Sequence, residues 1–450
     1  MRKAAQQTRM QAKTLSFKLG RTTSIDAGAS EAPAAIVQPP PLPIPPPLPV
    51  SLDSADQSIF LCPSSLSAEE ILADLVAMST RERVSDLQIQ SGRVIYANKA
   101  GSTAPILRWG ILDEKTVLRM VEILYAARRL SLGVLQEGAE NPNALREAIG
   151  TDRKLDFASE GDGSAPLGLS RFRVQVHLSN KGIGMTIRIL GSKIAPLDSL
   201  GLPTDVVESL RQKVTKKQGI GLIVGPTGSG KTTTLAGLLD WVRRNLNKHI
   251  VTVEDPIEYC YDDTVEEGSR PAPALVTQQE VGHHVRSFHQ GLMDALRKKP
   301  DIILVGEIRD AETLRTALEA AETGHFILAT LHTRGAGKTL GRMRQMFNLE
   351  QARSILQQFA DVGSFIMSQG LMPDVNGRYT ICCEYFSIQE IEDRNAIRKY
   401  VDGAFQDVEE RLNKPYNRRW NNELKALLAT GRIHQSAFEQ FYQVTGLENK

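Results

Sequence analysis

The chain has 450 residues, enough for two or three domains, and 41% of them are hydrophobic. The formal net charge of +2 excludes a strong overall attraction to nucleic acid or to an anionic membrane. The 4 cysteines form no CxxC pair, so we expect neither a disulfide framework nor a structural zinc site, which fits a reducing cytoplasm. No apolar run approaches the ~20 residues that span a bilayer, and the N-terminus lacks the apolar core of a signal peptide. We therefore expect a soluble cytoplasmic chain, or one held at a membrane by partners.

The N-terminal segment, residues 1–66, has the composition of a tail. The stretch Met1–Ser24 carries basic residues and no acidic residue, and Pro39–Pro49 is mostly proline. Such a sequence favours an extended polyproline II chain that forms no core. We interpret the segment as a disordered, basic and proline-rich tail. A docking arm for an anionic membrane or a partner protein stays open as the alternative.

Residues 67–195 have the pattern of a small α+β domain. Ser67 and Glu70 fit a capping box, and a helical stripe of apolar residues follows them. Three later segments alternate between apolar and polar residues: Leu87–Ile89, Phe172–Val176 and Met185–Ile189. This alternation predicts half-buried antiparallel strands.

Residues 196–375 have a different pattern, in which apolar strands alternate with helices after a linker at Pro196–Pro203. The predicted strands are Gly221–Val224, Ile250–Val253, Ile302–Val305 and Phe326–Leu331. Strands separated by helices are typical of a parallel, doubly wound sheet, so the fold class is α/β. After about Leu371 the chain becomes charged, and we expect residues 376–450 to form a helical C-terminal region.

The first of these strands runs into a loop that matches the pattern GxxxxGK[ST]. The loop consists of Gly225, Pro226, Thr227, Gly228, Ser229, Gly230, Lys231 and Thr232, and Thr233 begins the predicted helix. Glycines allow backbone amides to surround a β-phosphate at a helix N-terminus. Lys231 is expected to reach the β- and γ-phosphates of ATP, and Thr232 to offer its hydroxyl to Mg²⁺. A glycine-rich turn that binds nothing is the alternative, and the strand–loop–helix context disfavours it.

Three polar side chains follow the other predicted strands. Glu254, Glu307 and His332 each come at or just after a strand end. Ligands bind at the carboxyl ends of such a sheet, so we expect all three near the phosphate loop. Glu307 suits the magnesium side and Glu254 the attacking water, while His332 is placed to sense the γ-phosphate. A solvated strand end or a helix cap is the alternative for each.

Several further segments match motifs in their expected order, so the chain resembles the type II/type IV secretion-system ATPase family. Thr252–Glu258 is similar to the family's Asp box, Ile303–Asp310 to its Walker B segment, and Thr323–His325 with Leu331–Thr333 to its His box. Ser85–Leu87 and Pro196–Pro203 are similar to elements of its N-terminal domain and hinge. The resemblance extends over about residues 67–372.

The resemblance implies a PAS-like N-terminal domain and a RecA-like domain with ATP between them in a homo-hexameric ring. It also implies that arginines of the N-terminal domain reach the γ-phosphate. Arg173 and Arg188 lie on the matching strands, and Arg171 competes with them. Ordinary strand charge is the alternative. The implied partners are inner-membrane components of a secretion or pilus machine, with the chain peripheral on the cytoplasmic side and no direct contact with nucleic acid.

Departures from the family pattern indicate which members of the family this chain resembles most. Gln279 stands where the family usually has arginine, and the tetracysteine zinc module of the pilus-assembly and type II secretion members is absent. Asn395–Arg398 echoes a retraction-ATPase motif, but its surroundings match less well. We therefore favour a hexameric ATPase that powers a type IV secretion, conjugation-like machine. The alternatives are a pilus-retraction motor, a nucleic-acid translocase and a nucleotide-gated scaffold without turnover.

Overall fold

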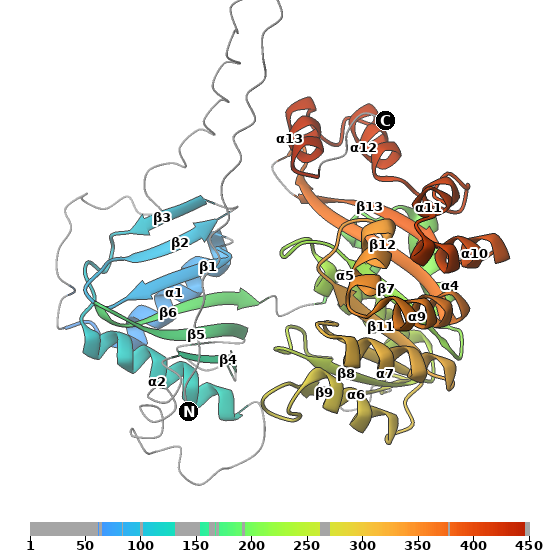
Figure 1. Cartoon of the computed structure of the whole chain (residues 1–450). Coiled ribbons are helices and arrows are strands. Elements are labelled where there is room, and N and C mark those ends of the chain that lie inside the picture. The colour runs from blue at the N-terminus through green and yellow to red at the C-terminus, as the bar shows by residue number, and fades with distance from the viewer. Residues whose placement is uncertain are drawn as a thin grey trace, which may run out of the picture. The chain divides into compact units, whose positions relative to one another are not determined.

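The structure is a computed structural model of the chain (Figure 1). It describes residues 62, 65–82, 84–99, 102–130, 154–161, 167, 171–190, 194–261, 271–376 and 379–445. The basic and proline-rich stretches predicted as a tail lie outside the described residues. No helix of the described segments is long and apolar enough to cross a bilayer. The described residues form a six-stranded and a seven-stranded sheet.

The first sheet has six strands in the order β3-β2-β1-β6-β5-β4, and its pairs are antiparallel. The strands are β1 (Asp86–Gln90), β2 (Ile95–Lys99), β3 (Ser102–Ile106), β4 (Lys154–Glu160), β5 (Arg171–Ser179) and β6 (Gly182–Leu190). The helices of this domain are α1 (Ala68–Glu82) and α2 (Glu114–Leu130). The capping box is confirmed, because the Glu70 amide donates to Ser67 Oγ and the Ser67 amide donates to Glu70 Oε2.

Alternation along β5 explains why this sheet has one apolar face. Phe172, Val174 and Val176 are buried in a core that also contains α1 and α2, whereas Arg173 and Gln175 point to the opposite face. The predicted half-buried strands are therefore confirmed. An α+β domain of this kind leaves a polar sheet face on which charged side chains can be held in register.

The second sheet has seven strands in the order β13-β12-β7-β11-β10-β8-β9. The strands are β7 (Gly219–Val224), β8 (His249–Glu254), β9 (Leu275–Glu280), β10 (Ile302–Val305), β11 (Phe326–Leu331), β12 (Gly363–Pro373) and β13 (Tyr379–Ser387). The pairs are parallel except β12–β13, which is antiparallel. The four strands expected from the sequence and the α/β class are confirmed.

The expectation that the chain is mostly helical after about Leu371 is wrong at its start. There the hairpin of β12 and β13 completes one side of the sheet. The two strands are buried almost throughout, yet they contain Ser368, Gln369 and Glu384. Polar residues inside an apolar run hide the strand pattern, and only their tertiary partners explain them.

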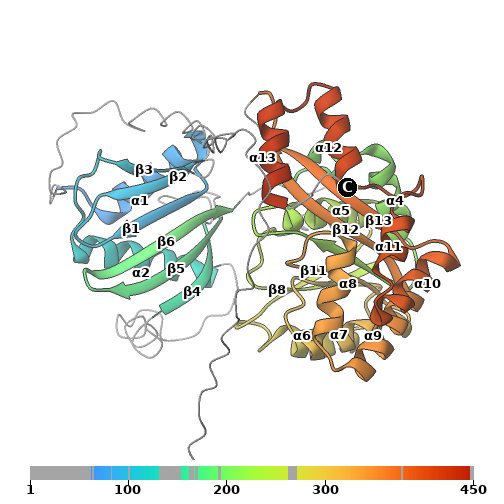
Figure 2. The ribbon, with the colours of Figure 1, turned by 45° about the horizontal axis from the view of Figure 1, so that its top comes forward.

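Helices cover both faces of this sheet, as Figure 2 shows from a second direction. The elements are η1 (Leu197–Leu200), α4 (Thr204–Val214), α5 (Lys231–Asn245), α6 (Phe288–Leu296), α7 (Ala311–Glu322), α8 (Ala336–Gln345), α9 (Leu349–Val362), α10 (Ile391–Lys399), η2 (Tyr400–Asp402), α11 (Phe405–Arg411), α12 (Trp420–Ala429) and α13 (Gln435–Thr445). One core contains η1, α4 and α5, and a second contains α6 to α11. The linker predicted at Pro196–Pro203 thus packs onto this domain through Leu197 and Leu202.

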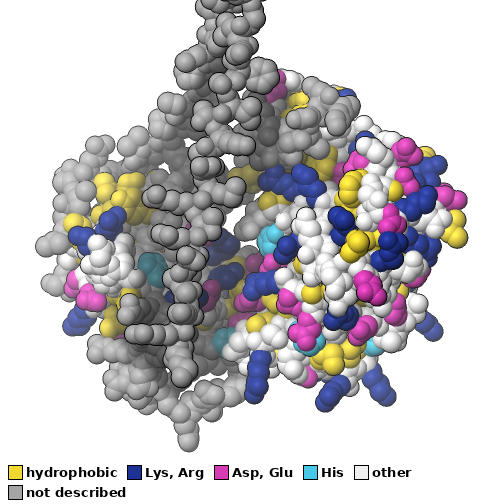
Figure 3. Space-filling model, viewed as in Figure 1, with side chains coloured by type: hydrophobic (Ala, Val, Ile, Leu, Met, Phe, Trp, Pro, Cys, Tyr) yellow, Lys and Arg dark blue, Asp and Glu magenta, His cyan; other side chains and the backbone are white. Residues whose placement is uncertain are grey.

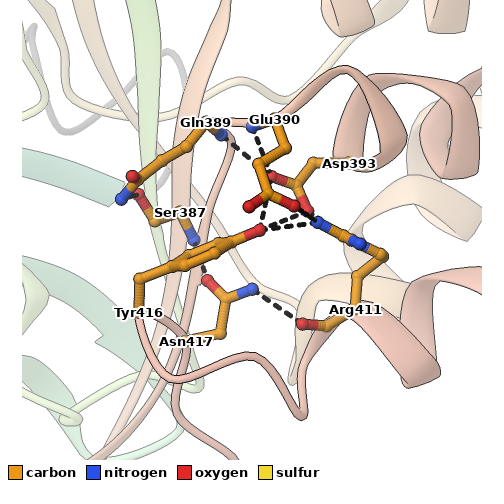
Figure 4. A network of polar contacts seen from close by, with 7 residues as sticks. All are labelled: Ser387, Gln389, Glu390, Asp393, Arg411, Tyr416 and Asn417. Atoms are coloured by element: carbon orange, nitrogen blue, oxygen red, sulfur yellow. Dashed lines mark hydrogen bonds and ion pairs between the residues drawn. The ribbon is translucent and has the colours of Figure 1, made fainter.

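A buried network of polar contacts joins α10, α11 and the end of β13 (Figure 4). Asp393 is fully buried, and its Oδ1 accepts a hydrogen bond of 2.7 Å from Arg411 Nε. The Tyr416 hydroxyl donates to the same carboxylate. Asn417 completes the network, because its side chain accepts from the Ser387 amide and donates to the Arg411 carbonyl. The network fixes α10 and α11 against the end of β13.

The first prediction concerns this network. Asp393→Ala would leave Arg411 with Glu390 as its remaining carboxylate partner and would remove the acceptor of two backbone amides. The free energy of unfolding should therefore fall by about 3 kcal/mol. Asp402→Ala is the matched control, since the Arg353–Asp402 pair is 61% and 52% exposed and should contribute less than about 1 kcal/mol. Urea unfolding followed by circular dichroism measures both. Equal losses in the two variants would contradict the structural role of the network.

Candidate nucleotide-binding site

The predicted site residues meet at one edge of the seven-stranded sheet. Leu331 pairs with Val224, so His332 follows beside the start of the phosphate loop. Val305 pairs with Val253, which places Glu254 next to Gly306 and near Glu307. Parallel strands end on the same side of a sheet, and ligands of such folds bind there.

The phosphate loop is folded in the form that its sequence predicts. Lys231 Nζ donates to the carbonyl oxygens of Gly225 at 2.8 Å and Pro226 at 3.0 Å, which holds the ammonium group within the loop. Burial lowers the pKa of Lys231, and the nearby carboxylates of Glu307 and Glu258 oppose this effect. A cation held in this way is available to phosphate oxygens without being bound in an ion pair.

A glutamine that sequence reasoning missed supports the loop from β12. Gln369 is fully buried; its Nε2 donates to the Ser229 carbonyl at 2.8 Å, and its Oε1 accepts from Thr234 Oγ1 at 2.9 Å. A Cβ atom at Gly225 would collide with the Gln369 carbonyl oxygen, so only glycine allows this approach. The signal in the sequence was a polar residue within an apolar run.

Glu254 ends β8 and is 7% exposed. Thr252 Oγ1 donates to Glu254 Oε1 at 2.6 Å, and Gln278 Nε2 donates to the same oxygen at 3.2 Å. Burial raises the pKa of Glu254 to about 7, while these two hydrogen bonds lower it. A carboxyl group that titrates near neutral pH can exchange a proton with a water molecule, as a general base must. The residue that contacts this carboxyl directly is Gln278, which precedes the Gln279 noted in the sequence.

Glu307 and His332 are brought together, as the sequence predicts. His332 Nε2 lies 3.2 Å from Glu307 Oε1, and Arg309 Nε donates to Glu307 Oε2 at 2.8 Å. Arg309 also donates to Asp255 Oδ2 at 3.2 Å, which links the ends of β8 and β10. The role of Arg309 was not predicted from the sequence, although it belongs to the segment that resembles Walker B.

The residues present fit a magnesium–nucleotide complex. Thr227 and Gly228 of the loop are exposed, Thr232 is partly exposed, and the Glu307 side chain is 21% exposed. Hydroxyl and carboxylate oxygens are ligands that Mg²⁺ accepts. The assignment of Thr232 and Glu307 to the metal remains a prediction.

The two arginines expected to act from the N-terminal domain lie opposite each other on adjacent strands. Arg173 on β5 pairs with Arg188 on β6, and both belong to the polar face of that sheet. Each has a carboxylate partner, Asp156 at 3.2 Å and Asp86 at 2.8 Å. Two like charges directly opposite are unfavourable, and the aspartates offset this repulsion. Whether Arg173, Arg188 or the neighbouring Arg171 reaches a nucleotide remains a prediction.

The sheet order, the glycine-rich loop at the end of β7, and the acidic strand ends define a P-loop ATPase core of the RecA-like type. A family model described as "Type II/IV secretion system protein" matches residues 162–418, which is more than half of the chain. The chain belongs to this family, which includes ATPases of secretion and pilus machines. The resemblance inferred from the motifs is thereby confirmed.

Individual relatives agree with this assignment. The chain is 33% identical over 310 residues to the "Type IV pilus retractation ATPase PilT" of Pseudomonas aeruginosa, covering 68% of this chain and 79% of the relative. The solved structure of the Legionella pneumophila ATPase DotB matches with a TM-score of 0.69 and 26% identity, over 86% of this chain and 99% of DotB. The pilus retraction motor PilT with bound ADP matches with a TM-score of 0.65 and 29% identity, over 84% and 97%.

The second prediction concerns the pH dependence that Glu254 contributes. Its pKa is raised in the folded chain, so its contribution to stability is present below about pH 4.5 and is lost as the pH rises through about 7. Glu254→Gln cannot ionise and should gain about 2 to 3 kcal/mol relative to the parent between pH 5 and pH 8. Thermal unfolding of both proteins across this range measures the difference. A difference that does not change with pH would contradict the burial of an ionisable group at this position.

Proposed function

We propose that this protein hydrolyses ATP with Mg²⁺ as part of a hexameric motor of a type IV secretion or pilus machine. The observation that supports this most directly is the meeting of Lys231, Glu254 and the Glu307–His332 pair at one sheet edge. A non-hydrolysing scaffold would need only the phosphate loop. The buried Glu254, with its pKa near 7, is what catalysis needs in addition.

Each residue has a distinct role in this proposal. Lys231 binds the β- and γ-phosphates. Glu254 orients the attacking water and accepts its proton, while His332, whose Nε2 lies 3.2 Å from Glu307 Oε1, senses the γ-phosphate. Thr232 and Glu307 would hold Mg²⁺, which supplies positive charge beside the phosphates when bound.

The machine that the motor serves is proposed at the level of the type IV systems, with the protein on the cytoplasmic side of inner-membrane partners. We favour a conjugation-like secretion machine, because the surroundings of Asn395–Arg398 match the retraction-ATPase motif less well. The solved structure of the ATPase DotB is similar over almost its whole length. A pilus-retraction motor is the second candidate, supported by the 33% identity to PilT. Loss of pilus-dependent surface movement in a deletion strain that still transfers its secreted substrate would favour the second candidate.

A nucleic-acid translocase receives less support from the surface. Figure 3 shows basic and acidic side chains interspersed over the described part of the face it presents. Single-stranded nucleic acid is normally bound along a basic groove with aromatic side chains. A surface on which basic and acidic side chains are mixed, on a chain with a net charge of +2, does not favour binding of nucleic acid.

The third prediction tests ATP hydrolysis itself. Lys231→Ala removes the cation of the phosphate loop, so steady-state phosphate release should fall to background while the circular dichroism spectrum stays that of the parent. Lys217→Ala, an exposed lysine before β7, is the matched control and should retain full turnover. Unchanged turnover in folded Lys231→Ala, or none in the parent, would refute the proposed function.

The fourth prediction concerns the arginines and the ring. If Arg188 supplies charge to the γ-phosphate, Arg188→Ala should lower kcat by a factor on the order of a thousand with little change in the affinity for a fluorescent ATP analogue. Arg81→Ala, on an arginine that is 70% exposed on α1, is the control.

Turnover per chain should also rise with protein concentration as rings form, and light scattering beside the ATPase assay would detect the rings. Full activity in a strictly monomeric chain would refute the ring mechanism.

A further inference from the structure

The segment that carries His332 is held at both of its ends. At one end it continues β11, which pairs with β7. At the other end it runs into α8, whose first residue is Ala336. Only residues 332–335 lie between these two anchors, so the direction of His332 depends on how firmly α8 begins.

The start of α8 is capped by another strand instead of by its own sequence. The N-cap residue, Gly335, has no side chain to accept a hydrogen bond from the helix. Glu384 on β13 takes this role, because its Oε1 accepts from the Ala336 amide at 2.8 Å. Ser368 on β12 accepts from the Gly335 amide at 2.8 Å. Ser368 and Glu384 are directly paired across the hairpin, so one cross-strand pair holds two successive amides.

The backbone of Gly335 makes this close approach possible. Its φ is +85°, a conformation that residues with a side chain rarely adopt, and a Cβ atom there would lie 3.2 Å from Glu384 Oε1. A second contact supports the same turn, since Thr339 Oγ1 lies 2.8 Å from Thr333 Oγ1. The geometry at the start of α8 is therefore built around the Glu384 carboxyl.

A carboxyl group in this position is costly to bury. Glu384 is 9% exposed, and burial raises its pKa to about 7, while the hydrogen bond from the Ala336 amide lowers it. Glu409 adds to the increase, and Arg419 and Lys338 oppose it. A helix N-terminus stabilises negative charge, which explains why a carboxyl can serve here.

The hairpin that carries Glu384 also supports the phosphate loop. Gln369, next to Ser368, binds the Ser229 carbonyl and the Thr234 hydroxyl. Successive residues of a strand point to opposite faces, so β12 holds the phosphate loop with one residue and the start of α8 with the next. The β12–β13 hairpin therefore holds both the phosphate loop and the start of α8.

We propose that Glu384, with Ser368, positions His332 for ATP hydrolysis by fixing the N-terminus of α8. This inference rests on the proposed ATPase function and adds a residue pair to it. Glu384 is a positioning residue, since its contacts are with the Gly335–Ala336 turn and it acts through the segment that follows His332.

The experiment compares Glu384→Ala, Glu384→Gln and Ser368→Ala in the full chain with the parent. Loss of the acceptor should lower kcat between about tenfold and a hundredfold in Glu384→Ala while KM for ATP stays within about twofold, because misplacement of a site residue affects the reacting geometry. Glu384→Gln keeps an acceptor oxygen and should restore kcat to within about threefold of the parent. Ser368→Ala is a smaller change and should lower kcat by an intermediate factor. It keeps the inference testable if Glu384→Ala does not fold.

Hydrogen–deuterium exchange provides a readout that does not depend on turnover. Amides of residues 332–340 should exchange faster in Glu384→Ala than in the parent, with little change elsewhere. Glu423→Ala is the matched control: this buried carboxyl on α12 pairs with Arg418, so its loss should lower stability without changing kcat.

The outcomes separate this inference from the proposed function. A parent without turnover would overturn the ATPase function and the inference together. If the parent is active, either of two results would overturn the inference and leave the ATPase function standing. The first is Glu384→Ala with unchanged kcat, and the second is unchanged exchange at residues 332–340.

Discussion

Parallel pairing of β7, β8, β10 and β11 is the constraint on which the rest of the structure depends. Because these strands are in register, four site residues lie at or just after strand ends on one edge of the sheet: Gly225, Glu254, Glu307 and His332. Each strand is buried on both faces by helices, so a shift in register would cost the packing of the whole layer. The positions of these residues along the sheet edge are therefore a consequence of core packing.

Burial at the end of β8 sets the proton affinity of Glu254. Glu254 is 7% exposed and accepts hydrogen bonds from Thr252 and Gln278. Burial raises its pKa to about 7, whereas a solvated glutamate would be a weak base. Glu384 shows the same effect at the start of α8, where a carboxyl is kept for its acceptor oxygens. Burial thus raises the pKa of two glutamates in different surroundings, one at the end of β8 and one beside the Ala336 amide at the start of α8.

The C-terminal region contributes to the site through the β12–β13 hairpin. A cavity of about 440 Å³ lies between the phosphate-loop residues Pro226–Ser229 and α13, and Glu384 and Phe441 are among its lining residues. Polar contacts around Asp393 hold α10 and α11 against the end of β13. The phosphate loop, the hairpin and the C-terminal helices therefore form one connected unit.

The sequence by itself determined the phosphate loop, the four central strands and the carboxylates that follow them. These features are local, since a glycine pattern or an apolar run has the same meaning wherever it occurs. Only the tertiary structure assigned Gln369, Ser368 and Glu384, because each is a polar residue inside an apolar strand whose partner is distant in the sequence. A buried polar side chain is tolerated when it forms hydrogen bonds with backbone amides, carbonyls or hydroxyls. No sequence pattern shows which distant group will be its partner.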